Sequence, residues 1–368
     1  MNQIIRVSLV CLISVCLVTA SAQATSHIED GNNDEPSQIG SEWGAVSDCP
    51  QLPRSFGPTG MQGKELLSWS GKPAPVLEAG PAGSWDEIGV IGPEVLRMGD
   101  DYRMWYTGIS GSTYQIGAAT SKDGLVWEKY AANPVLTVGE AGSWDEQYVW
   151  APAVLHYSST WEMWYVGYSG ATGSQIGYAT SQDGVNWVKY GGNPVLSASF
   201  FDAWESSGLI SPHVLYENGR YHMWYSNNPH GYIGYAVSSD GIHWERYPEN
   251  PLIEPSGGDD ENCGMVNYVS PSILHLDQYH MWYQAGQLCR GDTGGYWIVH
   301  STSPDGITWS DPEWAYGMGE YGMNAHYPTV ISRQNGLIKQ MWYVSCCKIY
   351  YAEEDLLDIQ IFLPLTMQ

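Results

Sequence analysis

Five prolines recur at spacings of 57 to 60 residues, and the residues around them include side chains that could do chemistry. The residues that directly follow them are Glu94, Ala153, His213, Ser272 and Thr329. Glu94 is the one carboxylic acid of this set, and a carboxyl group enclosed by aromatic side chains has its pKa raised by desolvation, which suits proton donation. Glu94 is therefore the first candidate for a general acid or base. The alternative is a structural glutamate, hydrogen-bonded to backbone at an inner strand.

Aromatic, imidazole and amide side chains lie close to the same prolines. Sugar rings present C–H faces that pack on flat aromatic side chains, and an indole or phenol adds one polar group. A histidine can orient a substrate, shuttle protons or bind a metal ion together with Glu94, whereas a lone histidine in a β-core is often only hydrogen-bonded. The candidate substrate-binding residues are Trp150, Tyr148, His213, Asn267, Tyr268 and His326.

Further carboxylates occur in a repeated segment. Ser-Trp-Asp-Glu stands at residues 84–87 and again at 143–146, and Asp-x-Trp-Glu at 202–205 is a degenerate third copy. Asp86 and Asp145 are therefore additional catalytic candidates, and Glu205 is a further acid that could replace a missing one. A feature repeated in several units is also typical of architecture, for instance of a connection between repeats.

An acidic run, Asp259-Asp260-Glu261, is inserted beside Cys263. Such a loop can bind Ca²⁺ or simply be solvated. The chain has no paired Cys-x-x-Cys spacing for a metal-thiolate site. We expect no resident cofactor and no metal ligands, with Ca²⁺ as the one ion that the sequence leaves open.

The elements that position these residues are shown by an internal repeat. Met-Trp-Tyr occurs five times, at 104–106, 163–165, 223–225, 281–283 and 341–343. Ser-x-Asp-Gly-x-x-Trp follows the first four copies, and Asn-Pro follows the first three. The tryptophans of Met-Trp-Tyr recur at one position and are expected to form the core between units. A period of about 60 residues with several short strands is typical of radially repeated β-sheets.

Each unit is predicted to contain four antiparallel strands. In the first copy these cover residues 94–98, 102–107, 115–121 and 126–130, and Asp-Gly supplies the positive φ that the last turn needs. The fifth copy lacks Asp-Gly-x-x-Trp, whereas Trp69 to Leu77 is similar to Trp127 to Leu136. The fold class is therefore all-β: a single five-bladed β-propeller over residues 63–360, in which an N-terminal strand completes the last blade and removes a sheet edge. Residues 361–368 form a C-terminal tail.

The composition excludes several classes of partner. The chain has 15 Lys and Arg against 40 Asp and Glu, a formal net charge of −25, with 18 Trp, 26 Tyr and 42 Gly. Too few cations are present for nucleic-acid or anionic-membrane binding. We expect a monomer whose partner is a carbohydrate, with no nucleic acid and no membrane insertion.

The N-terminus resembles a secretory signal peptide. Arg6 precedes the apolar stretch Val7–Val18, and Ala20-Ser21-Ala22 is a small-residue cleavage site. We expect residues 1–22 to be removed, residues 23–62 to form a leader and the protein to be secreted or periplasmic. Five cysteines then remain, some of them expected in disulfides: Cys263 with Cys289 or Cys49 with Cys346 or Cys347 are plausible pairs, and one thiol is left over.

These motifs resemble the five-bladed β-propeller glycoside hydrolases of families 43, 32, 62, 68, 117 and 130, relatives of arabinanases, levansucrases and invertases. The resemblance rests on Tyr-x-Met-Trp-Tyr, Ile-Gly-x-Ala-x-Ser-x-Asp-Gly-x-x-Trp and Asn-Pro-Val-Leu, and it covers residues 64 to 355. It implies a funnel at the propeller axis that holds three acids, from the first, second and third blades. In this sequence the corresponding positions hold Gly92, Ala153 and Ile210.

Two functions remain open at this point. The first is a secreted glycosidase whose acids have moved, because glycoside hydrolysis normally needs two carboxyl groups that flank the scissile bond. The second is a catalytically inactive propeller that binds a glycan or a surface partner. A sialidase-like protein is the least favoured reading, because the Asp-Gly turn is one residue shorter than an Asp-box and no arginine triad is visible. A second carboxyl facing Glu94 would distinguish the first two.

Overall fold

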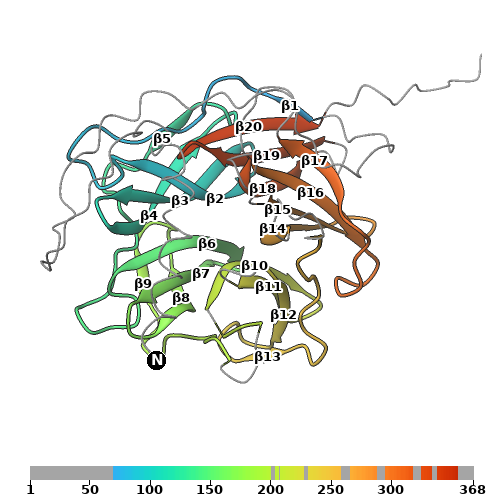
Figure 1. Ribbon diagram of the computed structural model, residues 1–368. Helices are drawn as coiled ribbons and strands as arrows, with labels where there is room; N and C mark the ends of the chain where they lie inside the picture. Colours follow the sequence, from blue (N-terminus) through green and yellow to red (C-terminus); the bar gives the residue numbers. More distant parts are fainter. Residues whose placement is uncertain are drawn as a thin grey trace, which may run out of the picture. The chain divides into compact units, whose positions relative to one another are not determined.

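The computed structural model describes residues 69–199, 204–206, 208–227, 231–257, 266–287, 295–317, 325–333 and 338–354. All of them lie in one compact unit, Arg54–Gln368. They form strands and turns and contain no helix, which confirms the all-β prediction (Figure 1). It follows that no described segment is an apolar helix of membrane-spanning length. The predicted signal peptide, leader and C-terminal tail lie outside the described residues, as do Cys49, Cys263 and Cys289.

The strands of the first two units follow the chain in order. Unit 1 contains β2 (Gly89–Met98), β3 (Asp101–Ser110), β4 (Thr113–Ser121) and β5 (Trp127–Lys129). Unit 2 contains β6 (Tyr148–Tyr157), β7 (Thr160–Ser169), β8 (Gly173–Ser181) and β9 (Trp187–Lys189). Each strand pairs antiparallel with the next one in its unit. A parallel bridge between Tyr114 and Tyr148 joins the two units into one sheet.

The remaining strands form three separate four-stranded sheets. Unit 3 contains β10 (Leu209–Glu217), β11 (Arg220–Asn227), β12 (Ile233–Ser238) and β13 (Trp244–Arg246). Unit 4 contains β14 (Asn267–His275), β15 (Tyr279–Gln287), β16 (Gly295–Ser303) and β17 (Glu313–Gly317). Unit 5 contains β18 (His326–Arg333), β19 (Ile338–Ser345), β20 (Lys348–Glu354) and, from the other end of the chain, β1 (Trp69–Gly71).

The first strand of every unit is the inner one. These strands contact one another in cyclic order, β2 with β6, β6 with β10, β10 with β14, β14 with β18, and β18 with β2. Figure 1 shows the five units arranged around their inner strands, with β1 beside β20 (Figure 1). β2 is longer than the predicted strand 94–98, because it begins four residues before Pro93.

Every inner strand is interrupted by a bulge at its proline. The pairing register shifts at this point in all five units, in β2 between Ile91 and Glu94 and in β18 between His326 and Thr329. The residue before each proline has a positive φ of 48° to 59°; these residues are Gly92, Ala151, Ser211, Ser270 and Tyr327. Proline has no N–H to donate, so a bulge is where a strand tolerates it.

Hydrogen bonds from tryptophan side chains join neighbouring units. The indole N–H of the Met-Trp-Tyr tryptophan donates to the carbonyl of an Asp-Gly turn in the next unit: Trp105 to Gly184 at 2.8 Å, Trp164 to Gly241 at 2.8 Å and Trp224 to Gly306 at 2.9 Å. Trp342 of unit 5 donates to Gly124 of unit 1 at 2.9 Å. These tryptophans are fully buried, which confirms their predicted place in the core between units.

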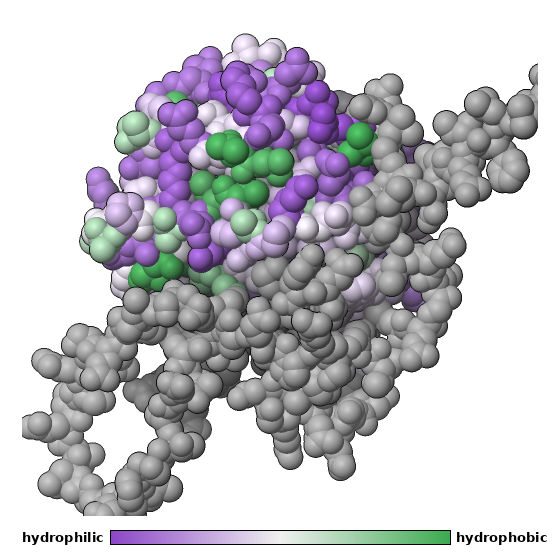
Figure 2. Space-filling view, turned by 90° about the horizontal axis from the view of Figure 1, so that it is seen from above, coloured by the Kyte–Doolittle hydropathy of each residue, from purple (hydrophilic) through white to green (hydrophobic). Residues whose placement is uncertain are grey.

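Trp282 is the exception. Its indole nitrogen is buried and has no hydrogen-bond partner in the described part of the chain. Its unit is followed by unit 5, which lacks the Asp-Gly-x-x-Trp turn that would accept the bond. On the part of the surface that Figure 2 colours, mainly hydrophilic residues surround a small apolar patch.

The contrast between Trp224 and Trp282 gives a matched test. Both Trp224→Phe and Trp282→Phe remove the same part of a buried indole, but only Trp224→Phe leaves a buried carbonyl, that of Gly306, without its donor. We expect Trp224→Phe to lower the free energy of unfolding by about 1–3 kcal/mol more than Trp282→Phe, measured by urea denaturation. Equal losses would show that the indole–carbonyl bond does not hold units 3 and 4 together.

Candidate functional site

Glu94 lies at the bulge of β2 and is 9% exposed. Its carboxyl group accepts hydrogen bonds from the Thr329 hydroxyl, at 3.3 Å, and from the Val154 backbone N–H. Burial raises the pKa of Glu94 to about 8, and the two hydrogen bonds lower this pKa only in part. Glu94 is therefore a protonated carboxylic acid at neutral pH, able to donate a proton.

The residues after the other prolines also link neighbouring units. The Ser272 hydroxyl accepts the Val330 N–H at 2.9 Å, and the Thr329 hydroxyl accepts the Val95 N–H at 3.4 Å. Glu94 takes part in the same pattern through Val154. Glu94 therefore has the buried environment of a proton donor, and it also makes the backbone hydrogen bond expected of a structural glutamate.

His213 also links two neighbouring units. Its Nε2 lies 3.1 Å from the carbonyl oxygen of Ile273, so Nε2 carries the proton and donates. Burial lowers the pKa of His213 to about 4, and the imidazole is neutral at physiological pH. The structure thus gives this predicted substrate-binding residue a bond between units 3 and 4.

An aromatic cluster forms at the start of β6. The Tyr148 ring lies 4.8 Å from Tyr114 and 5.2 Å from Tyr168, measured between centroids, and 6.1 Å from Trp150. Trp150 is 1% exposed, and its indole N–H has no hydrogen-bond partner among the described residues. The structure therefore brings the predicted Tyr148 and Trp150 together and leaves one buried donor available.

His326 begins β18 and packs against Tyr296, with 4.4 Å between the ring centroids. Burial lowers the pKa of His326 to about 3, so its imidazole is neutral. His326 is 3% exposed, and its Nδ1 has no hydrogen-bond partner within the described ranges. A buried polar atom without a protein partner is uncommon and marks a place where a ligand or water can bind.

Tyr268 and Asn267 fall in different surroundings. Tyr268 packs against Tyr283 in a core cluster between units 3 and 4, and its hydroxyl lies 2.5 Å from the Ser256 hydroxyl. Asn267 is half-buried, and its backbone passes close to Gly231. The described contacts therefore place Tyr268 in packing between units.

Asp86 and Asp145 are held in buried ion pairs. Asp86 is 2% exposed and lies 2.5 Å from Lys129 Nζ, and Asp145 lies 2.6 Å from Lys189 Nζ. Each aspartate also accepts from the serine two residues before it. The repetition of the whole arrangement is what the architectural alternative requires.

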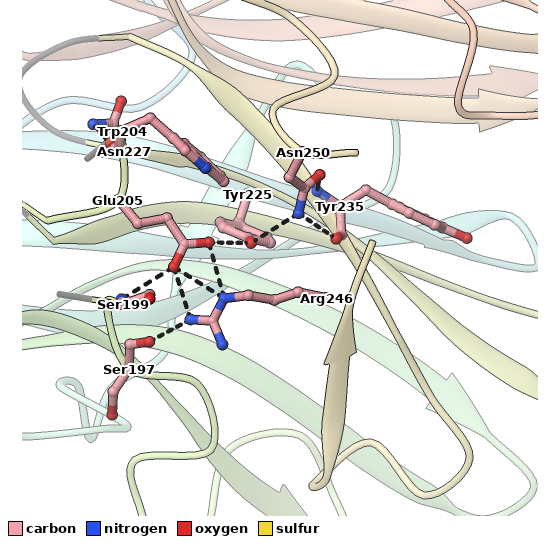
Figure 3. A network of polar contacts seen from close by, with 9 residues as sticks. All are labelled: Ser197, Ser199, Trp204, Glu205, Tyr225, Asn227, Tyr235, Arg246 and Asn250. Carbon is pink, nitrogen blue, oxygen red and sulfur yellow. Dashed lines mark hydrogen bonds and ion pairs between the residues drawn. The ribbon is translucent and has the colours of Figure 1, made fainter. Parts of the chain in front are cut away.

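Glu205 occupies the same place in unit 3 (Figure 3). Arg246 Nε lies 2.9 Å from each of its carboxylate oxygens, and the Tyr225 hydroxyl donates to it at 2.5 Å. Asn250 in turn donates to Tyr225, and it pairs with the backbone N–H and carbonyl of Tyr235 (Figure 3). The asparagine of the Asn-Pro motif thus completes a polar network in which both oxygens of the Glu205 carboxylate are already hydrogen-bonded.

Sequence reasoning missed the cations of these networks, although the signal was present. Lys129, Lys189 and Arg246 each stand two residues after the tryptophan of the Asp-Gly motif. It also missed Tyr327, the one large residue among those that precede the prolines. No group of three or more His, Cys, Asp or Glu in the described residues could hold a metal ion. The acidic run Asp259–Glu261 lies outside them.

Residues 61–211 match the model of the glycosyl hydrolases family 32 N-terminal domain. An uncharacterized protein of Mycobacterium tuberculosis is 29% identical over 222 residues, which is 57% of this chain and 71% of the relative. A protein of Aspergillus fumigatus named "Probable arabinan endo-1,5-alpha-L-arabinosidase B" is 25% identical over 283 residues, covering 67% of this chain and 70% of the relative. The resemblance to the five-bladed β-propeller glycoside hydrolases is confirmed.

Solved structures agree on the fold. One described as a glycoside hydrolase superposes with a TM-score of 0.58 at 19% identity, over 77% of this chain and 92% of its own. At that identity the likeness shows the fold alone. The chain thus has the fold seen in glycoside hydrolases, and the fold alone does not identify its catalytic residues.

The ion pair of Asp86 provides the test of its structural role. Lys129→Met leaves a buried, unpaired carboxylate, and we expect it to lower the free energy of unfolding by about 3–5 kcal/mol. The matched control is Lys122→Met, which breaks the exposed pair with Asp101 and is expected to cost less than about 1 kcal/mol. A small effect of Lys129→Met, measured by thermal and urea unfolding, would free Asp86 for another role.

Proposed function

We propose that the five units are the blades of one closed β-propeller, and that the protein is a glycoside hydrolase which cleaves a poly- or oligosaccharide at the propeller axis. The observation that carries this proposal is Glu94, a buried carboxylic acid with a pKa of about 8, held between units 1, 2 and 5. A carboxyl group kept protonated at neutral pH is the form that protonates a leaving glycosidic oxygen. The family relatives supply the substrate class.

The surrounding groups suit an uncharged, polyhydroxylated substrate. His213 and His326 are neutral because burial lowers the pKa of each imidazole, and Glu94 is neutral because burial raises its pKa. Tyr148 is half-buried and presents aromatic surface, with the buried Trp150 packed against it. Trp150 Nε1 and His326 Nδ1 have no hydrogen-bond partner among the described residues. We assign His213, His326, Tyr148 and Trp150 to substrate binding, Glu94 to proton donation, and Asp86 and Asp145 to the framework.

A second function, glycan binding without hydrolysis, is favoured by one observation. The described acids with the best claim to assist Glu94 are Asp86, Asp145 and Glu205, and each is neutralised by its own cation. The partners of these three carboxylates among the described residues are cations, hydroxyl groups and backbone, so each is already engaged in the framework. Binding without cleavage is therefore the outcome to set against hydrolysis.

We further propose that the protein is exported to an oxidising compartment. The N-terminal Arg6, apolar stretch and Ala-Ser-Ala site support this proposal, and an exported chain with five cysteines after residue 22 favours disulfides. N-terminal sequencing of the mature protein and mass spectrometry without reduction test cleavage and pairing together.

A hydrolysis screen tests the enzymatic proposal. We expect the mature chain to cleave arabinan or an aryl glycoside, and Glu94→Gln to lose at least about 100-fold in rate. Because the acid must be protonated, the wild-type rate should fall as the pH rises above about 8. Glu128→Gln, at an exposed site on β5, is the control and should retain the wild-type rate. Cleavage undiminished in Glu94→Gln would remove Glu94 from the mechanism, and binding without cleavage would establish the second function.

The raised pKa of Glu94 also predicts how stability depends on pH. Between pH 6.5 and 8 the folded state keeps a proton on Glu94 that the unfolded state has lost, since an unburied glutamate titrates near 4.5. The free energy of unfolding should therefore fall by about 2 kcal/mol across this interval and level off above it. In Glu94→Gln this fall should be absent, and in Glu128→Gln it should persist. Parallel urea midpoints for wild type and Glu94→Gln would contradict the burial of an ionisable carboxyl.

A further inference from the structure

One end of the inner strands carries a ring of five residues in the left-handed conformation, here called the pre-proline ring: Gly92, Ala151, Ser211, Ser270 and Tyr327. Positive φ is unfavourable for a side chain larger than that of glycine, and costs of about 1–3 kcal/mol are usual where the surrounding structure imposes it. The bulge at each proline imposes it in all five units.

Members of this ring lie against one another. A side chain on Gly92 would come within 3.7 Å of the Ala151 Cα. The Ser270 hydroxyl donates to the Ser211 hydroxyl at 3.1 Å. Four of the five members are thus small and close to their neighbours in the adjoining unit, and only unit 5 contributes a long side chain.

The phenol of Tyr327 lies among aromatic residues of three units. Its ring is 6.5 Å from that of His326, and the phenols of Tyr114 in unit 1 and Tyr296 in unit 4 are near enough to influence its ionisation. Burial, followed by these two phenols, raises the pKa of Tyr327, so the hydroxyl remains protonated over the physiological range. It is a hydrogen-bond donor and not a nucleophile.

Tyr327 stands on the same strand as the residue that contacts the proposed proton donor. Two residues further along β18, the Thr329 hydroxyl donates to the Glu94 carboxyl at 3.3 Å. His326, which directly precedes Tyr327, is buried, and its Nδ1 has no hydrogen-bond partner among the described residues. β18 thus carries a protonated phenol, an imidazole nitrogen without a partner among the described residues, and the hydroxyl that contacts the neutral Glu94 carboxyl.

We infer that Tyr327 is a substrate-contacting residue that determines specificity: its phenol fills the space that four small residues leave at the centre of the pre-proline ring and donates a hydrogen bond to a sugar oxygen. This inference rests on the proposed function and adds to it a residue that the sequence repeats do not single out. The bulk of Tyr327 limits the size of the sugar that the site accepts, and its hydroxyl orients that sugar toward Glu94.

The fold itself suggests the variants. Tyr327→Phe keeps the ring and removes the donor, whereas Tyr327→Ser installs the residue that units 3 and 4 already carry at this position, so the bulge is retained. Tyr130→Phe, at an exposed tyrosine beyond β5, is the matched control. Binding is measured by calorimetry in a Glu94→Gln background, with linear arabinan and branched arabinan as probes, and kcat and KM are measured in the otherwise wild-type chain.

We expect Tyr327→Phe to weaken binding of the linear glycan at least tenfold, and Tyr327→Ser to shift preference at least tenfold toward the branched glycan. Tyr130→Phe should match its parent in both measurements. Wild-type binding and preference in both Tyr327 variants would overturn the inference while leaving hydrolysis by Glu94 intact. If the protein binds these glycans but cleaves none, the hydrolase proposal fails and the binding measurements still decide the role of Tyr327. Absence of both binding and cleavage would overturn both.

Discussion

A left-handed residue followed by proline interrupts every inner strand, and the organisation of the site depends on this bulge. It places the residue after the proline where it reaches the next unit, as Glu94 does with the Val154 N–H and Ser272 with the Val330 N–H. It also sets the residue before the proline in a ring with its counterparts. One backbone irregularity repeated five times thus produces both a belt of bonds between units and a separate ring of side chains.

The buried ion pairs of the protein lie outside these bulges. In units 1, 2 and 3 an acid from the connecting segment is buried and balanced by a cation two residues after the fourth-strand tryptophan, as in Asp86 with Lys129 and Glu205 with Arg246. A buried charge is tolerated only when it is paired and hydrogen-bonded, and the repeated tyrosine and asparagine supply the remaining bonds. These buried charges are therefore held in the framework, whereas Glu94, His213 and His326 at the bulges of the inner strands are neutral.

That neutrality has a consequence for chemistry. Glu94 retains its proton because burial disfavours the carboxylate, and His326 stays unprotonated because burial disfavours the imidazolium. The same desolvation thus creates a proton donor and leaves hydrogen-bonding atoms uncharged. The half-buried Tyr148, packed against Trp150, adds apolar surface, and this combination is what the proposed sugar substrate requires.

The repeats alone determined the all-β class, the number of Met-Trp-Tyr units and the position of the core tryptophans, because residues at one register in every copy must meet the same environment. Pairing of the N-terminal Trp69 segment with the last unit also followed from its likeness to the Asn-Pro segments, since a strand absent at one end was present at the other. The roles of individual acids did not follow. Glu94 and Asp86 are both buried carboxyls, and only the tertiary structure separates them, because Lys129 comes from a strand 43 residues away and reaches Asp86 but not Glu94. The surroundings of Tyr327 are likewise decided by the tertiary structure. Tyr114 and Tyr296, which help to raise its pKa, come from units 1 and 4, and a pKa depends on neighbours in space and not in sequence.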